Sequence, residues 1–220
     1  MNVTDAVMTR RSIRAFTDQP VDLETLRRVL DKARWAPSGC NFQPWEATIV
    51  TGEPLRKLQE QMLGSETQKP IEYSFSEPEN SPEHKARLQS LGAKMYGTLQ
   101  IAREDTKARG DFSRQNIVSF GAPVLLLNYI RRSFGAPQWS DVGMWLQTIM
   151  LLLREEGLDS CPQEWMSFYA KELKDQIGVS DEDYILFTGL AIGYRDLDEP
   201  VNTWERERVP LDESIRWLGF

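Results

Sequence analysis

The chain has 220 residues, of which 40% are hydrophobic and 27% are charged, and its formal net charge is −7 at pH 7. These values are typical of a folded globular protein, and they exclude both a disordered chain and a global basic surface for nucleic acid. A local basic pocket remains compatible with the acidic balance. The two cysteines, Cys40 and Cys161, lie far apart in the sequence and are expected to be free thiols.

The sequence predicts a soluble, cytoplasmic protein that binds neither membranes nor nucleic acid. Residues 1–14 contain no apolar run suited to a signal peptide, and the longest apolar candidate, residues 149–153, is far shorter than the ~20 residues of a membrane helix. His84 is the single histidine and lies in a polar segment. A Ser-His-Asp triad or a histidine-rich zinc site would depend on that one residue, so no metal is expected and an organic cofactor is the better carrier of difficult chemistry.

Helices and strands alternate along the first part of the chain. The spacing of apolar residues predicts a helix over 22–35, with Asp22 as its cap, followed by a strand over 45–51 and a helix over 53–62. Residues 64–82 are polar and contain three prolines. We expect them to form a long surface excursion, of a kind that often acts as a lid.

The second part of the chain continues the alternation. The pattern predicts a long helix over 83–109, a buried strand over 123–129, helices over 141–155 and 168–177, and a buried central strand over 184–194. The helix over 141–155 is apolar on nearly every side, so it is expected to be wrapped by other elements or by a partner subunit.

The last segment, residues 196–220, has no periodicity but carries many large apolar residues. These are Val201, Trp204, Leu211, Trp217, Leu218 and Phe220. A tail this apolar needs a surface to dock on, and wrapping around a second protomer would supply one, which motivates a homodimer hypothesis. The alternating strands and helices indicate an α/β or α+β layered sheet.

Two clusters of arginine could bind a phosphate. Residues 10–14 offer three guanidinium groups and a hydroxyl, which are the bidentate donors that phosphate oxygens favour. Arg206 and Arg208 alternate in an extended segment, so both side chains point to the same side and could clamp a phosphate. Taken alone, each cluster is more typical of solvated surface charge.

Two loop-like segments could line a pocket. In residues 36–46, Ser38, Asn41 and Gln43 could supply the mixed donors and acceptors that the edge of a heterocycle demands. The alternative is an ordinary helix-to-strand loop. Residues 160–165 could present backbone N–H groups beside a tryptophan, and a capping turn explains them equally well.

The order and spacing of these segments resemble the FMN-dependent nitroreductase family, in particular its nitrobenzoate-reductase-like branch. The segments that carry the resemblance are Arg-Arg-Ser-Ile-Arg-Ala-Phe (10–16), Ala-Pro-Ser-Gly-Cys-Asn-Phe-Gln-Pro-Trp-Glu (36–46), Cys-Pro-Gln-Glu (161–164), Gly-Leu-Ala-Ile-Gly-Tyr (189–194) and Asn-Thr-Trp-Glu-Arg-Glu-Arg (202–208). The resemblance implies an α+β fold, a three-layer α-β-α sandwich with a mixed, mainly antiparallel sheet and a domain-swapped C-terminal tail. It also implies a single FMN-binding domain over 1–220, with a variable substrate-covering region at about 53–119.

The resemblance further implies which residues contact FMN at the interface of a homodimer. The expected cofactor-binding residues are Arg10, Arg11, Ser12, Arg14, Pro37, Ser38, Gly39, Asn41, Pro162, Gln163, Glu164, Arg206 and Arg208. The arginine clusters would hold the phosphate, Arg14 would approach the pyrimidine edge of the flavin, and residues 38–41 would come from the partner protomer. Phe42, Trp139 and Trp165 are candidates for contact with the substrate.

By the same resemblance, the chain is expected to be an FMN-dependent oxidoreductase that takes electrons from NADH or NADPH. It would reduce a small nitroaromatic or related electron-poor acceptor in a two-electron ping-pong mechanism, with the flavin rather than a side chain carrying the chemistry. The same fold also supports reductive dehalogenation, enone reduction and flavin fragmentation, and a non-catalytic flavin-binding protein is a further alternative.

Overall fold

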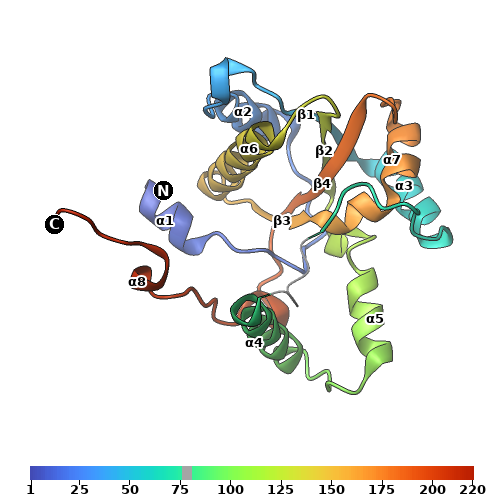
Figure 1. The fold of residues 1–220 in the computed structure, drawn as a ribbon. Helices are drawn as coiled ribbons and strands as arrows, with labels where there is room; N and C mark the ends of the chain where they lie inside the picture. Colours follow the sequence, from blue (N-terminus) through green and yellow to red (C-terminus); the bar gives the residue numbers. More distant parts are fainter. Residues whose placement is uncertain (76–80) are drawn as a thin grey trace.

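A four-stranded antiparallel sheet forms the centre of the computed structural model, which describes residues 1–75 and 81–220 (Figure 1). The strand order is β1-β2-β4-β3, so β2 and β4 are the central strands. The bounds are Glu46–Thr51 for β1, Val124–Arg131 for β2, Asp159–Gln163 for β3 and Tyr184–Gly193 for β4. The strands predicted over 45–51, 123–129 and 184–194 are therefore confirmed.

Helices cover both faces of this sheet, which confirms the three-layer sandwich (Figure 1). On β2, Val124 and Leu126 pack toward α2 and α6, while Leu125 and Leu127 pack toward α3 and α7. This alternation follows from the two-residue period of a strand whose two faces are both buried. The bounds are Leu23–Ala33 for α2, Gly52–Gly64 for α3, Ala136–Glu155 for α6 and Ala170–Ile177 for α7.

Helix α2 begins with the cap that the sequence predicts. The side chain of Asp22 accepts a hydrogen bond from the backbone N–H of Thr25 at 2.9 Å, so the predicted cap of α2 is confirmed.

The remaining elements are α1 (Val3–Thr9), α4 (Pro82–Thr98), α5 (Thr106–Arg114), α8 (Leu211–Ser214) and the 3₁₀ turns η1 (Gly39–Asn41), η3 (Ser119–Gly121), η4 (Glu164–Tyr169) and η5 (Pro200–Asn202).

Two predictions about these elements are wrong. The single helix expected over 83–109 is two helices, α4 and α5, because Gln100 adopts a left-handed backbone conformation (φ 56°) that ends α4. Residues 160–163 are not a turn but most of strand β3, and Pro162 is tolerated there because β3 lies at the end of the strand order and pairs with β4 alone. Within the four named strands every pairing is antiparallel, and the parallel pairing is an isolated bridge between Ser12 and Ser160.

The described part of the 64–82 excursion packs against the sandwich, and residues 76–80 lie outside the described residues. Glu72, which the sequence places in a polar surface stretch, is buried and its Oε1 lies 2.5 Å from Nζ of the fully buried Lys174 on α7. The same oxygen accepts a hydrogen bond from the backbone N–H of Leu186 at 3.0 Å and lies 3.1 Å from Arg132. We call this cluster of Glu72, Lys174 and Arg132 the latch, because it fixes the excursion to β4 and α7.

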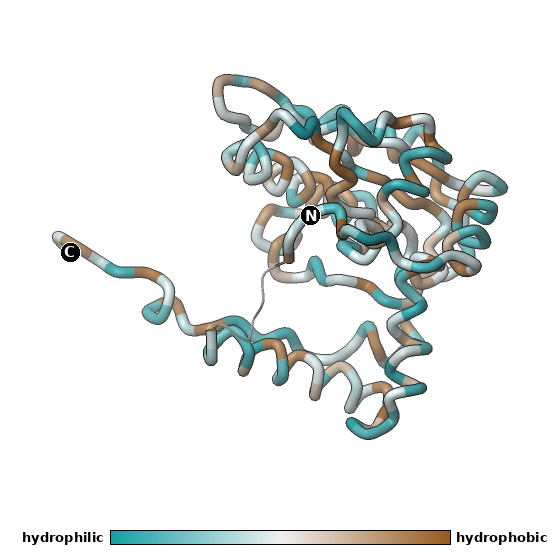
Figure 2. The backbone as a smooth tube through the Cα atoms, turned by 45° about the vertical axis from the view of Figure 1, so that its right-hand side comes forward, coloured by the Kyte–Doolittle hydropathy of each residue, from teal (hydrophilic) through white to brown (hydrophobic). Residues whose placement is uncertain are grey.

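The C-terminal tail, residues 196–220, extends away from the sandwich and ends far from it (Figures 1 and 2). Its last apolar side chains are exposed, among them Trp217, Leu218 and Phe220.

No helix in the described part of the chain is long and apolar enough to cross a membrane.

Replacing Lys174 with methionine is expected to lower the free energy of unfolding by about 3 kcal/mol, because the Glu72 carboxylate stays buried with less compensation. The double variant Glu72→Gln/Lys174→Met removes both charges and is expected to be more stable than Lys174→Met alone. Urea unfolding followed by tryptophan fluorescence measures both effects.

The control for the latch is Lys171→Met, at an exposed position of α7, which should change the stability by less than about 0.5 kcal/mol. If Lys174→Met unfolds at the same urea concentration as the unchanged chain, the latch contributes nothing to stability.

Candidate functional site

The N-terminal arm, residues 10–16, is held in place by burial of its apolar side chains beside β3. Ile13 is fully buried and Phe16 nearly so, in a cluster that also contains Cys161. The backbone N–H of Ile13 donates to the carbonyl of Ser160 at 3.1 Å. Because Ile13 points into the core, the arginines on either side of it lie partly exposed in front of β3.

The tail is tied to the arm by Asn202, which is buried in η5. Its Oδ1 accepts the backbone N–H of Arg14 at 2.9 Å, and its Nδ2 donates to the carbonyls of Ala15 and Asp196, each at 2.9 Å. All of its side-chain hydrogen-bonding groups are thus engaged with backbone on both sides of the junction. The residues after Asn202 consequently lie against the arm.

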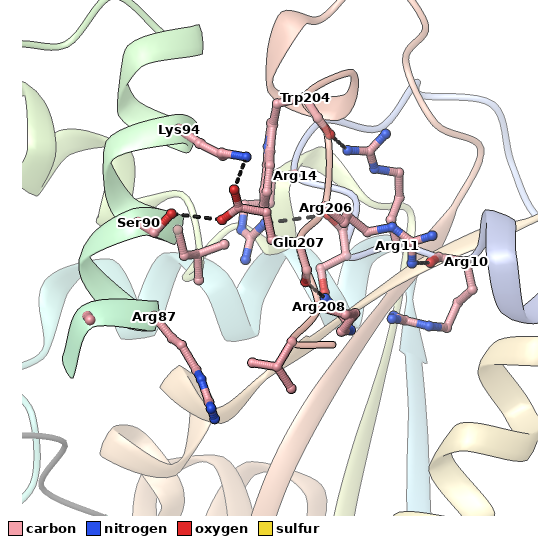
Figure 3. A pocket seen from close by; sticks show the side chains of 14 residues that line it. Arg10, Arg11, Arg14, Arg87, Ser90, Lys94, Trp204, Arg206, Glu207 and Arg208 are labelled. Carbon is pink, nitrogen blue, oxygen red and sulfur yellow. Dashed lines mark hydrogen bonds and ion pairs between the residues drawn. The ribbon is translucent and has the colours of Figure 1, made fainter. Parts of the chain in front are cut away.

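A cavity of about 800 Å³ lies between the arm, the tail and α4 (Figure 3). Its polar lining comes from all three segments: Arg10, Arg11, Ser12, Arg14, Arg87, Ser90, Lys94, Arg206, Glu207 and Arg208. The two arginine clusters predicted from the sequence, almost 200 residues apart in the chain, therefore meet at one site. The volume falls within the roughly 300–1,000 Å³ of small-molecule and cofactor pockets.

Two of the arginines reinforce the junction between arm and tail. The guanidinium of Arg11 donates to the carbonyl of Trp204 and lies 5.7 Å from the centre of its ring, and that of Arg206 donates to the carbonyls of Met8 and Arg10. Within the described residues, Arg10 donates no such bond across the junction, and the guanidinium of Arg208 bonds only to the neighbouring carbonyl of Glu207 at 2.6 Å. That of Arg14 donates to the carbonyl of Ser12 within the arm at 3.5 Å. The guanidinium groups of Arg10, Arg14 and Arg208 are accordingly left available for a ligand, and those of Arg10 and Arg208 come from the two separate clusters.

The arginines that the arm and the tail contribute to the cavity are not paired with carboxylates. In the described ranges, none of the five arm and tail arginines forms a salt bridge with a carboxylate. Burial, followed by repulsion from Arg206 and Arg208, holds the pKa of Arg10 below its ordinary value. Burial and neighbouring arginines lower the pKa of Arg206 in the same way. Unpaired guanidinium groups whose charge is disfavoured form a strong binding site for an anion.

The end of β3 offers polar atoms without partners next to the arm. Gln163 is buried and its Nε2 donates to the carbonyl of Asn116 at 2.8 Å, but its Oε1 has no hydrogen-bond partner. Ser160 Oγ and Trp165 Nε1 are also buried and unpartnered. Buried polar atoms are normally satisfied, so a donor and acceptors left free near the arm suit a polar ligand that supplies the missing bonds. None of these three residues lines the cavity itself.

The loop expected from the sequence to join the site, residues 37–41, does not line this cavity within one chain. The backbone N–H of Gly39 donates instead to the buried carboxylate of Asp141 on α6, at 3.2 Å. Cys40, Asn41 and Gln43 all adopt left-handed backbone conformations, with φ between 49° and 57°. Such conformations are strained for residues other than glycine and are concentrated at functional sites.

The three residues predicted to contact the substrate lie in two different parts of the structure. Trp139 and Trp165 lie at the two ends of an aromatic cluster that sequence reasoning missed, made up of Tyr73, Phe75, Phe168 and Phe187 besides them. Successive ring centres are 4.9–5.5 Å apart, and the hydroxyl of Tyr73 donates to the carbonyl of Phe187 at 2.6 Å. Phe42 is exposed and lies 6.1 Å from Phe134.

Other candidate groups stay outside the cavity. Both cysteines are free, as predicted; Cys161 is buried, which raises the pKa of its thiol to about 11, so the thiol stays protonated at neutral pH. His84 is exposed, and its Nδ1 lies 2.6 Å from Oγ of Ser81 at the start of α4. Across residues 1–75 and 81–220, no group of histidine, cysteine and acidic side chains could hold a metal ion.

Comparison with known proteins identifies one family. The sequence profile described as the Nitroreductase family matches residues 7–194. The chain is 33% identical to 4-nitrobenzoate reductase of Pseudomonas putida, over 98% of this chain and 96% of that protein. It is 31% identical to nitroreductase NfnB of Mycolicibacterium smegmatis, over 94% and 89% of the two chains.

Solved structures agree with the sequence comparison. The crystal structure of the FMN and NADPH-dependent nitroreductase NfnB from Sphigopyxis sp. strain HMH superimposes with a TM-score of 0.95 at 44% identity, covering 100% of both chains. The FMN-dependent NfnB from Mycobacterium smegmatis in complex with NADPH gives 0.91 at 29% identity, over 98% of this chain and 97% of that one.

Replacing Asn202 with alanine is expected to lower the free energy of unfolding by about 2 kcal/mol, because half-buried backbone groups of Arg14 and Asp196 lose their side-chain partner and the carbonyl of Ala15 loses one of its two donors. The tail should also open more often, so native-state trypsin cleavage in the tail should be faster. Thr203→Ala, which removes an exposed hydroxyl bonded only to Pro200, is the matched control. Equal cleavage rates for Asn202→Ala and Thr203→Ala would contradict the role of Asn202 as the junction.

Proposed function

Because the chain belongs to the nitroreductase family, we propose that it is an FMN-dependent oxidoreductase that uses NAD(P)H to reduce nitroaromatic or related electron-poor acceptors. The observation that carries this proposal is the cavity of about 800 Å³ lined by five arginines that form no salt bridge within the described residues, on an arm that pairs with β3, the strand that carries buried polar atoms without partners. That combination suits a ligand with a phosphate at one end and a hydrogen-bonding heterocycle at the other.

The residues at the site fit FMN, and different residues would bind its phosphate and its ring system. Arg10 and Arg208, whose guanidinium groups are left available, would bind the phosphate by charge-assisted hydrogen bonds. Arg11 and Arg206 hold arm and tail together and so fix the positions of the other two. Gln163 Oε1 and Trp165 Nε1, both buried and unpartnered, would meet polar edges of the ring system.

When bound, FMN supplies the redox chemistry, taking two electrons from the nicotinamide and giving them to the acceptor in a ping-pong order. The contribution of the chain is to bind and orient. Arg14 lines the cavity and would favour negative charge on the pyrimidine side of the flavin. The aromatic cluster from Trp139 to Trp165 does not line this cavity within one chain, and it would hold a flat acceptor and exclude water from the other side of the flavin.

We further propose that the chain works as a homodimer in the cytoplasm as one FMN-binding domain. The loop 38–41 does not reach the cavity of its own chain, so it would contact FMN only from a second copy. The exposed apolar residues of the tail, among them Leu211, Trp217 and Phe220, supply a surface for that copy to bind. Wrapping of each tail around the other protomer would bury these residues and complete both cofactor sites.

The names of the relatives favour nitro reduction over the other reactions of this fold. They are called 4-nitrobenzoate reductase, nitroreductase, chloronitrobenzene nitroreductase and nitrobenzene nitroreductase, at 29–33% identity over most of the chain. The Gly64–Pro82 excursion offers no separate charged clamp in its described residues, since Glu72 is held in the latch.

An absorbance spectrum of the purified protein tests the proposed function. We expect flavin bands that bleach on anaerobic addition of NADPH or NADH and recover on addition of 4-nitrobenzoate. A colourless protein that cannot be reconstituted with FMN would contradict the proposal. A flavin that binds but is reduced by neither nicotinamide would point to a non-catalytic flavin-binding protein.

A chain ended after Val209 tests the dimer, because it keeps Arg206 and Arg208 but loses the exposed apolar end of the tail. Sedimentation velocity should show a dimer for the full chain, and more monomer together with less bound FMN for the shortened one. Leu63→Ser, which changes an exposed apolar residue on α3, is the control and should remain dimeric. A full chain that is monomeric and retains FMN would rule the dimer out.

A further inference from the structure

The wall of the cavity opposite the arm is one face of α4, and it carries its own donors for an anion. Arg87, Ser90, Leu91 and Lys94 all line the cavity, and their spacing of three, four and seven residues places them on one side of the helix. Figure 3 shows Ser90 and Lys94 directed at the tail segment, across from the arm arginines. The family resemblance places this helix in the variable substrate-covering region and assigns none of its residues to a ligand.

The charge of the cavity exceeds what one flavin phosphate can neutralise. Seven cationic side chains line it, and the single carboxylate among the lining residues is Glu207. A phosphate monoester carries about two negative charges near neutral pH. Net positive charge therefore remains in the cavity once FMN is bound at Arg10 and Arg208, and the two cations of α4 are balanced by exposed carboxylates of the tail.

Glu207 shows how α4 holds an anionic group. One of its carboxylate oxygens forms an ion pair with Nζ of Lys94, and the other accepts a hydrogen bond from Oγ of Ser90 at 2.8 Å (Figure 3). Arg87 lies 3.9 Å from Glu213, at the limit of an ion pair. All four charged side chains of these two pairs are at least 36% exposed, and such pairs contribute little to stability, so a dianionic ligand can replace the tail carboxylates.

We propose that Arg87, Ser90 and Lys94 form a second anion subsite that binds the 2′-phosphate of NADPH and makes the chain prefer NADPH to NADH. The proposal rests on the proposed function, because the dinucleotide has to share the cavity with FMN. NADPH and NADH differ only in this phosphate, which is a dianionic monoester matched to two cations and a hydroxyl. A carboxylate of the acceptor is the other source of negative charge, but it carries one charge where the subsite offers two.

The test is the double variant Arg87→Gln/Lys94→Gln, assayed as holoenzyme. We expect the KM for NADPH to rise about tenfold or more, as expected for lost charge-assisted bonds, and the KM for NADH to stay within about twofold. The control is Arg103→Gln/Lys107→Gln, which makes the same change in net charge at exposed positions beyond α4 that do not line the cavity. It should leave both KM values and the FMN content unchanged.

Isothermal titration calorimetry measures ligand affinity and so tests the subsite without turnover. Adenosine 2′,5′-bisphosphate should bind the unchanged holoenzyme at least about tenfold more tightly than 5′-AMP, and this difference should vanish in Arg87→Gln/Lys94→Gln. Loss of FMN from the variant would place the α4 cations at the flavin phosphate and overturn the proposal. A higher KM for 4-nitrobenzoate with an unchanged KM for NADPH would assign the subsite to the acceptor instead.

An unchanged chain that uses NADH as well as NADPH would also overturn the proposal. These outcomes are separate from failure of the proposed function, which shows as a protein that binds no flavin or whose flavin neither nicotinamide reduces.

Discussion

Five arginine side chains that form no salt bridge with any described carboxylate meet where the N-terminal arm and the C-terminal tail join, and the site depends on the structure holding them there. Like charges at such distances repel, so the junction needs compensating interactions. Burial of Ile13 and Phe16 supplies one such interaction. The three hydrogen bonds from the side chain of Asn202 to backbone groups supply another. A bound anion would relieve the remaining repulsion, so cofactor binding and stability of the junction are linked.

The scaffold limits this positive charge to the cavity. Directly behind the arm, buried Asp159 of β3 binds Arg195 through two contacts of 2.6 Å and Arg154 through one of 2.9 Å. Asp159 thereby pairs with two arginines that do not line the cavity. The side-chain hydrogen bond to Asp159 raises the pKa of Arg195, whereas the pKa of Arg10 is lowered by burial and by its arginine neighbours. The opposite pKa shifts distinguish Arg195, which is paired within the protein, from Arg10, which is available to a ligand.

Much of the fold could be predicted from apolar periodicity, because α2, β1, β2 and β4 each satisfy a local pattern. The errors come from interactions that local patterns do not contain. The apolar spacing of α4 continues past Gln100, whose left-handed conformation divides the helix. Glu72 reads as a surface acid because its partner, Lys174, lies 102 residues away in the chain. The convergence of the arm and tail arginines came from family resemblance, whereas the role of α4 in the same cavity needed the structure.

In the proposed function, the arm and tail arginines bind the phosphate of the cofactor. The affinities of the apoprotein for FMN and for riboflavin, measured by fluorescence quenching, test it most directly, because the two ligands differ only in that phosphate. Several charge-assisted bonds of about 1.5–3 kcal/mol each predict that FMN binds at least a hundredfold more tightly and that added salt narrows the gap. Equal affinities for FMN and riboflavin would contradict the account.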